Sequence, residues 1–78
     1  MMNNKYEQEF KKIRNTPFTD IANRAIVVGE SREGISISYV SRVLHGERIP
    51  RIHYFVAIAD AIGVSMEGLW EFLKQNYE

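Results

Sequence analysis

The stretch that most constrains the fold of this 78-residue chain lies between two glycines, Gly34 and Gly46. Its sequence, GISISYVSRVLHG, has the features of a short helix with a marked start and a marked end. Ser36 can act as the N-cap, because its hydroxyl can accept a backbone N–H, and Gly46 can take the left-handed conformation that follows many helices. We therefore expect a helix over residues 36–45.

The two sides of this expected helix differ in character. At 3.6 residues per turn, one side carries three aliphatic side chains, Val40, Val43 and Leu44. The opposite side carries only hydrogen-bonding groups: Ser38, Ser41, Arg42 and His45. A helix that lies in the major groove of DNA needs such a side, since short side chains allow close approach and a few donors can read base edges. An ordinary amphipathic helix with a polar solvent face fits these residues equally well.

Composition indicates one small soluble domain over residues 1–78. With 45% of its residues hydrophobic and 26% charged, the chain can build a single modest core. The absence of cysteine excludes disulfides and thiolate metal sites and is typical of a reducing, cytoplasmic location. No apolar run has the length of a membrane span, and the N-terminus lacks the apolar core of a signal peptide. We therefore expect no membrane partner.

The net charge is zero, which by itself argues against a nucleic-acid partner, but the charges are unevenly distributed. Residues 1–33 hold six basic and five acidic side chains, residues 34–54 hold three and one, and residues 55–78 hold one and four. His45 and His53 can add positive charge to the middle segment. A local basic surface matters more than the total charge for phosphate contact, so the middle segment is where such contact is expected.

Two helices are expected before the Gly34–Gly46 segment. Residues 4–14 carry apolar side chains at helical spacing: Tyr6, Phe10 and Ile13. Thr16 and Pro17 then form a helix start, with Thr16 as N-cap and Pro17 at the first helical position. The second helix is expected to bury Ile21, Ala22, Ala25 and Ile26.

A polar segment bounded by glycines separates the second expected helix from the third. Residues 29–34, GESREG, have the composition of a loop. The sequence leaves open whether the second helix continues through Val27 and Val28 or whether these two residues begin a short extended segment.

Two further helices are expected after the segment. Pro50 lies in a connection over residues 47–51, and residues 52–62 form the fourth helix. Its apolar face is expected to carry Ile52, Phe55, Ile58, Ala59 and Ile62. Gly63 ends this helix and Ser65 caps a fifth. The fifth helix is expected to turn four side chains inward, Met66, Leu69, Phe72 and Leu73. Five short helices without a competing strand pattern predict an all-α domain.

The apolar face of the fifth expected helix is unusually wide. Trp70 and Tyr77 extend it into a stripe at helical spacing, which runs through Met66, Trp70, Leu73 and Tyr77. An aromatic stripe of this kind is usually part of a core, but one this wide also fits an interface with another chain.

Three consecutive segments together resemble a known family. They are GISISYVSRVLHG at 34–46, RIP at 48–50 and IHYFVAIADAIGVSMEGL at 52–69. In this order and without a gap, they are similar to the recognition helix, the basic loop and the fourth and fifth helices of the Cro/CI-repressor type of helix-turn-helix domain, also called the xenobiotic-response-element type. Upstream, TDIANRA at 19–25 resembles the second helix of the family. The resemblance implies a five-helix, lambda-repressor-like bundle with residues 36–45 as the recognition helix.

The chain departs from the family pattern at two places. Phe18 occupies the position where the family usually has a Gln that supports the recognition helix and touches a phosphate. The connection between the second and third helices is longer than usual, so residues 26–34 form an insertion whose acidic character favours a structural or protein-contact role. A turn of this length cannot by itself fix the angle between the two helices.

The resemblance also implies the residues that contact DNA. Contacts with base edges map onto Ile37, Ser38, Ser41 and Arg42. Among these, Arg42 can pair with O6 and N7 of guanine, whereas Ile37 can either touch a thymine methyl or lie at the edge of the core. Contacts with phosphates map onto Tyr39, His45, Arg48, Arg51 and His53. Arg48 and Arg51 could instead be solvated loop charges. Trp70 and Tyr77 are the candidate contacts of a homodimer.

These features predict a sequence-specific DNA-binding transcriptional regulator, a repressor, that places residues 36–45 in the major groove. Its partner is double-stranded DNA, bound as a homodimer in the cytoplasm, where the bound protein is associated with the nucleoid. The alternative is a helix-turn-helix module for protein interaction, such as an antitoxin or an anti-repressor, with which the neutral charge and the missing Gln agree.

No enzymatic chemistry is expected. Two histidines without cysteine do not make a zinc site, and no phosphate-binding loop or paired carboxylates occur. Ser41 and His45 could lie on one helix face, but no acid is placed to orient the histidine. We therefore predict no catalytic residue, metal, cofactor or small-molecule ligand.

Overall fold

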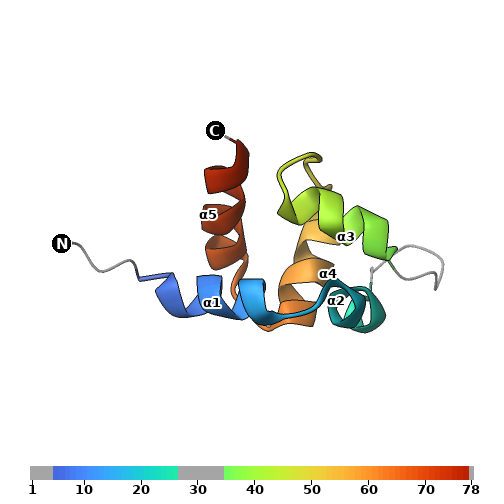
Figure 1. The fold of residues 1–78 in the computed structure, drawn as a ribbon, viewed down its shortest axis with the longest axis horizontal. Helices are drawn as coiled ribbons and strands as arrows, with labels where there is room; N and C mark the ends of the chain where they lie inside the picture. The colour runs from blue at the N-terminus through green and yellow to red at the C-terminus, as the bar shows by residue number, and fades with distance from the viewer. Residues whose placement is uncertain (1–4, 27–34, 78) are drawn as a thin grey trace.

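The computed structural model describes residues 5–26 and 35–77, with only the backbone of Tyr77, and these residues form α-helices (Figure 1). The elements are α1 (Glu7–Asn15), α2 (Phe18–Arg24), α3 (Ile37–Leu44), α4 (Ile52–Ile62) and α5 (Met66–Tyr77). No strand occurs among the described residues. The prediction of an all-α fold with five helices is therefore confirmed.

The five helices enclose one core. In Figure 1, α1 and α5 lie at one end of the molecule and α2 and α3 at the other, with α4 between them. α2 packs against α3 and α4, and α5 packs against α1, α3 and α4. The buried cluster at the centre draws on every helix and consists of Ile13, Ile21, Ala22, Ala25, Ile35, Val40, Val43, Leu44, Ala57, Ile58, Ala59, Ala61, Ile62, Leu69 and Leu73.

Within the part of the chain that the structure describes, no single helix is long and apolar enough to cross a membrane. One pair of consecutive helices, α4 and α5, reaches that length and composition together, and it is bent by 107°.

The ends of α4 and the start of α5 follow the predicted signals. α4 spans Ile52–Ile62, which is the predicted range. It ends at Gly63, whose φ of +90° is the left-handed conformation that glycine adopts readily. Ser65 then caps α5, because its Oγ accepts the backbone N–H of Gly68 at 3.0 Å.

The start of α2 differs from the prediction. Thr16 is not the N-cap of α2 and Pro17 is not its first helical residue: Pro17 itself is the N-cap, with φ −61° and ψ 144°, and the helix begins at Phe18. Thr16 precedes a proline, which disfavours helical backbone at that residue, and it is extended at φ −90° and ψ 119°. Its hydroxyl donates a hydrogen bond to the carbonyl of Lys12 at 2.7 Å. Thr16 therefore ends α1.

Three side chains predicted to be buried are exposed. Ile26 is 80% exposed, because α2 ends at Arg24 and the extended backbone of Ala25 takes Ile26 off the buried face of the helix. Ile52 is 63% exposed and Met66 is 48% exposed. Each is the first residue of its helix, and since helical side chains point towards the N-terminus, these two project beyond the packed turns.

The insertion predicted over residues 26–34 lies mostly outside the described residues. Val27 and Val28, for which the sequence left open a continued helix or a short extended segment, also lie outside the described residues. The residues on either side, Ala25 and Ile35, are both buried in the core.

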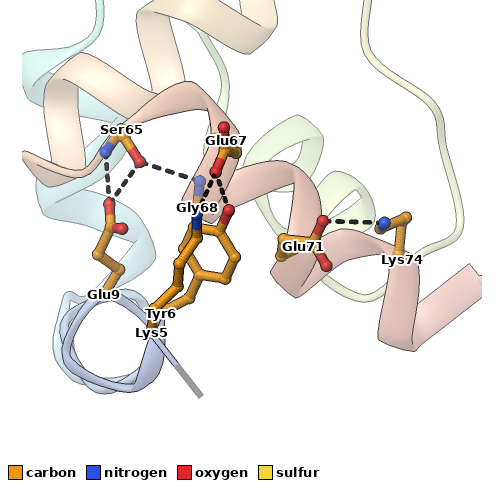
Figure 2. A network of polar contacts seen from close by, with 8 residues as sticks. All are labelled: Lys5, Tyr6, Glu9, Ser65, Glu67, Gly68, Glu71 and Lys74. Atoms are coloured by element: carbon orange, nitrogen blue, oxygen red, sulfur yellow. Dashed lines mark hydrogen bonds and ion pairs between the residues drawn. The ribbon is translucent and has the colours of Figure 1, made fainter. Parts of the chain in front are cut away.

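α1 is fixed to the turn between α4 and α5 by polar contacts (Figure 2). The Glu9 carboxylate accepts hydrogen bonds from the backbone N–H and the hydroxyl of Ser65, both at 2.7 Å. Glu67 accepts a hydrogen bond from the hydroxyl of Tyr6 and forms an ion pair with Lys5 at 3.4 Å. The Glu9 carboxylate thus stands at the N-terminus of α5, where the helix dipole favours a negative charge.

Gly46 should tolerate substitution less well than Gly63. Both have positive φ, +78° and +90°, so alanine at either position is expected to cost about 1–2 kcal/mol of backbone strain. At Gly46 the added Cβ would also lie 2.8 Å from the backbone oxygen of Asn76 in α5, whereas at Gly63 it would meet the flexible end of Lys12. We expect Gly46→Ala to lower the free energy of unfolding by roughly twice as much as Gly63→Ala in urea denaturation. Equal losses would contradict the close approach of α5 to Gly46.

Candidate nucleic-acid interface

α3, the predicted recognition helix, is capped at both ends. Ser36 is its N-cap, and the Ser36 Oγ accepts the backbone N–H of Tyr39 at 3.1 Å. At the other end, the N–H groups of Gly46 and Glu47 bond to the carbonyls of Val43 and Arg42 at 3.1 and 2.8 Å. This pair of bonds around a left-handed glycine is the Schellman arrangement. The predicted helix start and stop are therefore confirmed.

The C-terminal end of α3 is also held by α5. Asn76 donates a hydrogen bond from Nδ2 to the carbonyl oxygen of Leu44 at 2.6 Å. The carbonyls of the last turn of a helix have no partner within that helix, so the Asn76 amide satisfies one of them. The last turn of α3 is thus fixed relative to a helix 32 residues away in sequence.

The two sides of α3 have the predicted environments. Val40, Val43 and Leu44 are buried in the core. The opposite side exposes Ile37, Ser38 and Arg42, and Ser41 is half-buried. Among the described residues, no hydrogen bond or ion pair engages the Arg42 guanidinium. Ile37, for which the edge of the core was the alternative, is 48% exposed, so about half of its surface is covered.

His45 is positioned by contacts on two sides. Its Nδ1 lies 3.2 Å from the Ser41 hydroxyl, one helical turn earlier. Its ring meets the edge of Phe18 at a centroid distance of 5.7 Å and an interplanar angle of 87°. Phe18, which stands in place of the Gln usual at this position, therefore supports the end of α3 through a ring contact.

A polar groove runs between the start of α3 and the start of α4. It has a volume of about 530 Å³ and is lined by Ile35, Ser36, Tyr39, Arg48, Ile49, Arg51 and Tyr54. The Arg48 guanidinium lies 5.3 Å from the centre of the Tyr39 ring, and that ring packs on Tyr54 at 5.1 Å. Arg51 is the N-cap of α4, so both helices present their N-terminal ends here. Two arginines and two helix N-termini make the groove suitable for an anion such as a phosphate.

The comparison with protein families agrees with this geometry. Residues 34–69, which span α3, α4 and the first turn of α5, match a family model described as helix-turn-helix. Residues 34–69 are therefore similar to a Cro/CI-type helix-turn-helix. No curated protein and no solved structure matches the chain. The resemblance seen in the sequence is confirmed over residues 34–69, and a helix-turn-helix in these residues supports a role in DNA binding.

The helix-turn-helix brings together most of the predicted phosphate contacts. Tyr39, Arg48 and Arg51 line the one groove, and His45 lies at the far end of α3. His53 is exposed in the first turn of α4 and is not among the residues that line the groove. Tyr54 lines the groove but was not predicted from the sequence. The available signal was its position on the fourth helix, three residues after Arg51.

The described residues of the helix-turn-helix chain hold no cluster of three or more His, Cys, Asp or Glu side chains that could bind a metal ion. The His45 imidazole contacts the Ser41 hydroxyl on one side and the phenyl ring of Phe18 on another.

Of the two predicted dimer contacts, Trp70 is 43% exposed and the side chain of Tyr77 lies outside the described residues. Trp70 meets the edge of Phe55 at a ring-centroid distance of 6.4 Å. It lines a second, apolar hollow together with Ile49, Pro50, Ile52 and Phe55.

Replacing Ser36 by Ala should destabilise the helix-turn-helix, because the N–H of Tyr39 loses its partner. We expect a loss of about 1 kcal/mol in the free energy of unfolding, measured by urea denaturation. Ser38→Ala, two residues along on the exposed face, is the matched control and should change stability by less than about 0.5 kcal/mol. A similar loss of unfolding free energy in both variants would contradict the capping role of Ser36.

Proposed function

We propose that this chain is a sequence-specific repressor that places α3 in the major groove and binds as a homodimer to a two-fold-related DNA site. The observation that carries the proposal is the outer face of α3. It combines the exposed Arg42, which has no partner in the described part of the chain, with the small side chains of Ser38 and Ser41. Small side chains permit close approach to the bases, and a free guanidinium can donate two hydrogen bonds to guanine.

The polar groove supports the proposal because it can hold the DNA backbone. A phosphate in the groove would meet Arg48 and Arg51 and the N–H groups at the starts of α3 and α4. Such a contact fixes the register of the protein on the duplex, and the groove directly adjoins the first turn of α3. Base and phosphate contacts would then be made by one rigid surface.

His45 supports a second phosphate contact at the far end of α3. The Ser41 hydroxyl lies against Nδ1, so Nε2 is the ring nitrogen that remains for a phosphate oxygen. Phe18 and Ser41 hold the ring in place, which reduces the entropy lost when the contact forms.

Repression is proposed because occupancy of the DNA is sufficient for it. A protein seated in the major groove excludes other proteins from the same base pairs. A reporter gene placed behind the selected binding site should be expressed less when the chain is present, and an increase would replace repression with activation.

The second candidate is a module that binds another protein. It is favoured by the exposed apolar side chains of Ile49, Ile52 and Trp70, which line one apolar hollow. The response of DNA binding to salt distinguishes the two candidates.

Binding to duplex DNA should weaken steeply with salt. Each phosphate contact releases condensed counterions, so the logarithm of the binding constant is expected to fall by about 0.9 per contact for each unit of log salt concentration. Fluorescence anisotropy with a labelled random-sequence duplex between about 50 and 200 mM salt gives the slope. Absent or salt-independent binding would favour the protein-interaction module.

Arg42 and Arg51 should have different effects on binding. After selection of bound sequences from a random duplex pool, we expect Arg42→Ala to lose about 1–3 kcal/mol of preference for the selected sequence and to keep weak binding to any duplex. Arg51→Ala should weaken binding to all sequences alike and lower the salt slope by about 1.

Lys11→Ala, on the exposed side of α1, serves as the control of equal charge and should change neither quantity. A uniform loss across sequences in Arg42→Ala would reassign Arg42 to a phosphate contact.

A further inference from the structure

Three side chains that line the polar groove contact one another in series. The Arg48 guanidinium lies over the Tyr39 ring, 5.3 Å from its centre, which is within the range of a cation–π contact. The Tyr39 ring in turn contacts the Tyr54 ring, with 5.1 Å between the ring centres and 50° between the ring planes. The three residues come from the connection after α3, from α3 and from α4.

The two tyrosines are held by more of the structure than the arginine. Both are half-buried and pack against the core, whereas Arg48 is exposed. The backbone N–H of Tyr39 is bonded to the Ser36 cap at 3.1 Å. Tyr54 lies in the first turn of α4, where helical side chains point towards the N-terminus of the helix and so towards the groove. Support therefore passes from Tyr54 through Tyr39 to Arg48.

An exposed arginine on a connecting segment gains from such support when it binds a phosphate. A side chain with many rotamers loses entropy when a contact fixes it, and this loss weakens binding. A guanidinium that already lies on an aromatic ring is restricted before binding. Its flat shape allows it to cover the ring with one face while the N–H groups at its edge serve for hydrogen bonds to a phosphate.

We propose that Tyr54 is a positioning residue for phosphate binding: it holds the Tyr39 ring, and this ring holds the Arg48 guanidinium in the groove. The proposal rests on the proposed DNA-binding function and goes beyond it, because it assigns a role to a residue that acts only through another side chain. Since phosphate contacts carry no sequence information, Tyr54 affects the binding of every DNA sequence alike.

A direct hydrogen bond from the Tyr54 hydroxyl to a phosphate would be a different role for the same residue. The two roles need different parts of the side chain, because positioning depends on the ring and a direct contact depends on the hydroxyl. Tyr54→Phe removes the hydroxyl and keeps the ring, whereas Tyr54→Leu removes both. A comparison of these two variants therefore separates the roles.

The test measures binding by fluorescence anisotropy to the selected duplex and to a random-sequence duplex. We expect Tyr54→Leu to weaken binding to both duplexes by roughly threefold to tenfold, because Arg48 must then be ordered at the moment of binding. The salt slope should stay unchanged, since the same number of phosphates is contacted, whereas Arg48→Ala should lower it by about 1. Tyr54→Phe should bind like the unaltered chain.

A double-mutant cycle shows whether Tyr54 acts through Arg48. In the Arg48→Ala background, Tyr54→Leu should cause no further loss of affinity, because the side chain that it positions is absent. Tyr6→Leu is the matched control and should leave DNA binding unchanged. Tyr6 is also a half-buried tyrosine with a ring contact, to Phe10 at 6.3 Å, but it adjoins α1, at the other end of the molecule from α3 (Figure 1).

The free protein gives a readout that does not depend on DNA. Because Arg48 lies over the Tyr39 ring, the ring current should shift the NMR signals of the Arg48 side-chain protons. Tyr54→Leu should reduce this shift and Tyr54→Phe should keep it. Urea denaturation checks that the variants fold, and if Tyr54→Leu does not, Tyr54→Met replaces the ring by a flexible apolar side chain.

Three outcomes would overturn the proposal. Equal losses of affinity in Tyr54→Phe and Tyr54→Leu would make the hydroxyl a direct phosphate contact. A further loss from Tyr54→Leu in the Arg48→Ala background would show that Tyr54 does not act through Arg48. An unchanged affinity in Tyr54→Leu would show that Arg48 needs no support. Failure of the proposed function is distinct from all three, because then the unaltered chain binds no duplex, and the proposal fails with it.

Discussion

The structure depends on the way α3 is fixed by residues distant from it in sequence. The Asn76 amide holds the last turn of α3 from the end of α5, and Gly46 allows the two chain segments to approach because it has no Cβ. On its inner side, α3 is anchored by Val40, Val43 and Leu44 in the common core. Since a long connection precedes α3, these contacts take over the orienting role that a tight turn has in a shorter helix-turn-helix.

Acidic and basic side chains have different places on the molecule, although its net charge is zero. Negative side chains such as Glu9 and Glu67 form contacts between helices, where they hold α1 against the start of α5. Positive side chains of the α3–α4 region, Arg42, Arg48 and Arg51, are left on the surface that adjoins the outer face of α3. The total charge is thus a poor guide to the partner, because several acidic side chains form contacts within the fold.

Much of the fold could be predicted because its signals are local. Ser36 and Gly46 mark the ends of α3, and the spacing of apolar residues gives α4 its observed range. The errors have tertiary or steric causes: Thr16 is extended because a proline follows, and Ile52 and Met66 project beyond their helices. The residue types of the candidate site were predictable. The ring contacts of Phe18 with His45 and of Tyr39 with Tyr54 were not, because they join helices whose relative placement is not encoded locally in the sequence.

The burial of Ala25 and Ile35 has a consequence for how this fold can change in length. Both residues belong to the core, so the chain is anchored on either side of the segment that joins α2 to α3. The entropy of closing a flexible loop rises slowly, by about 0.6 kcal/mol for each doubling of its length. Additional residues at this point therefore cost little folding free energy, and the connection is a position at which a domain of this kind can acquire a new segment while the outer face of α3 stays unchanged.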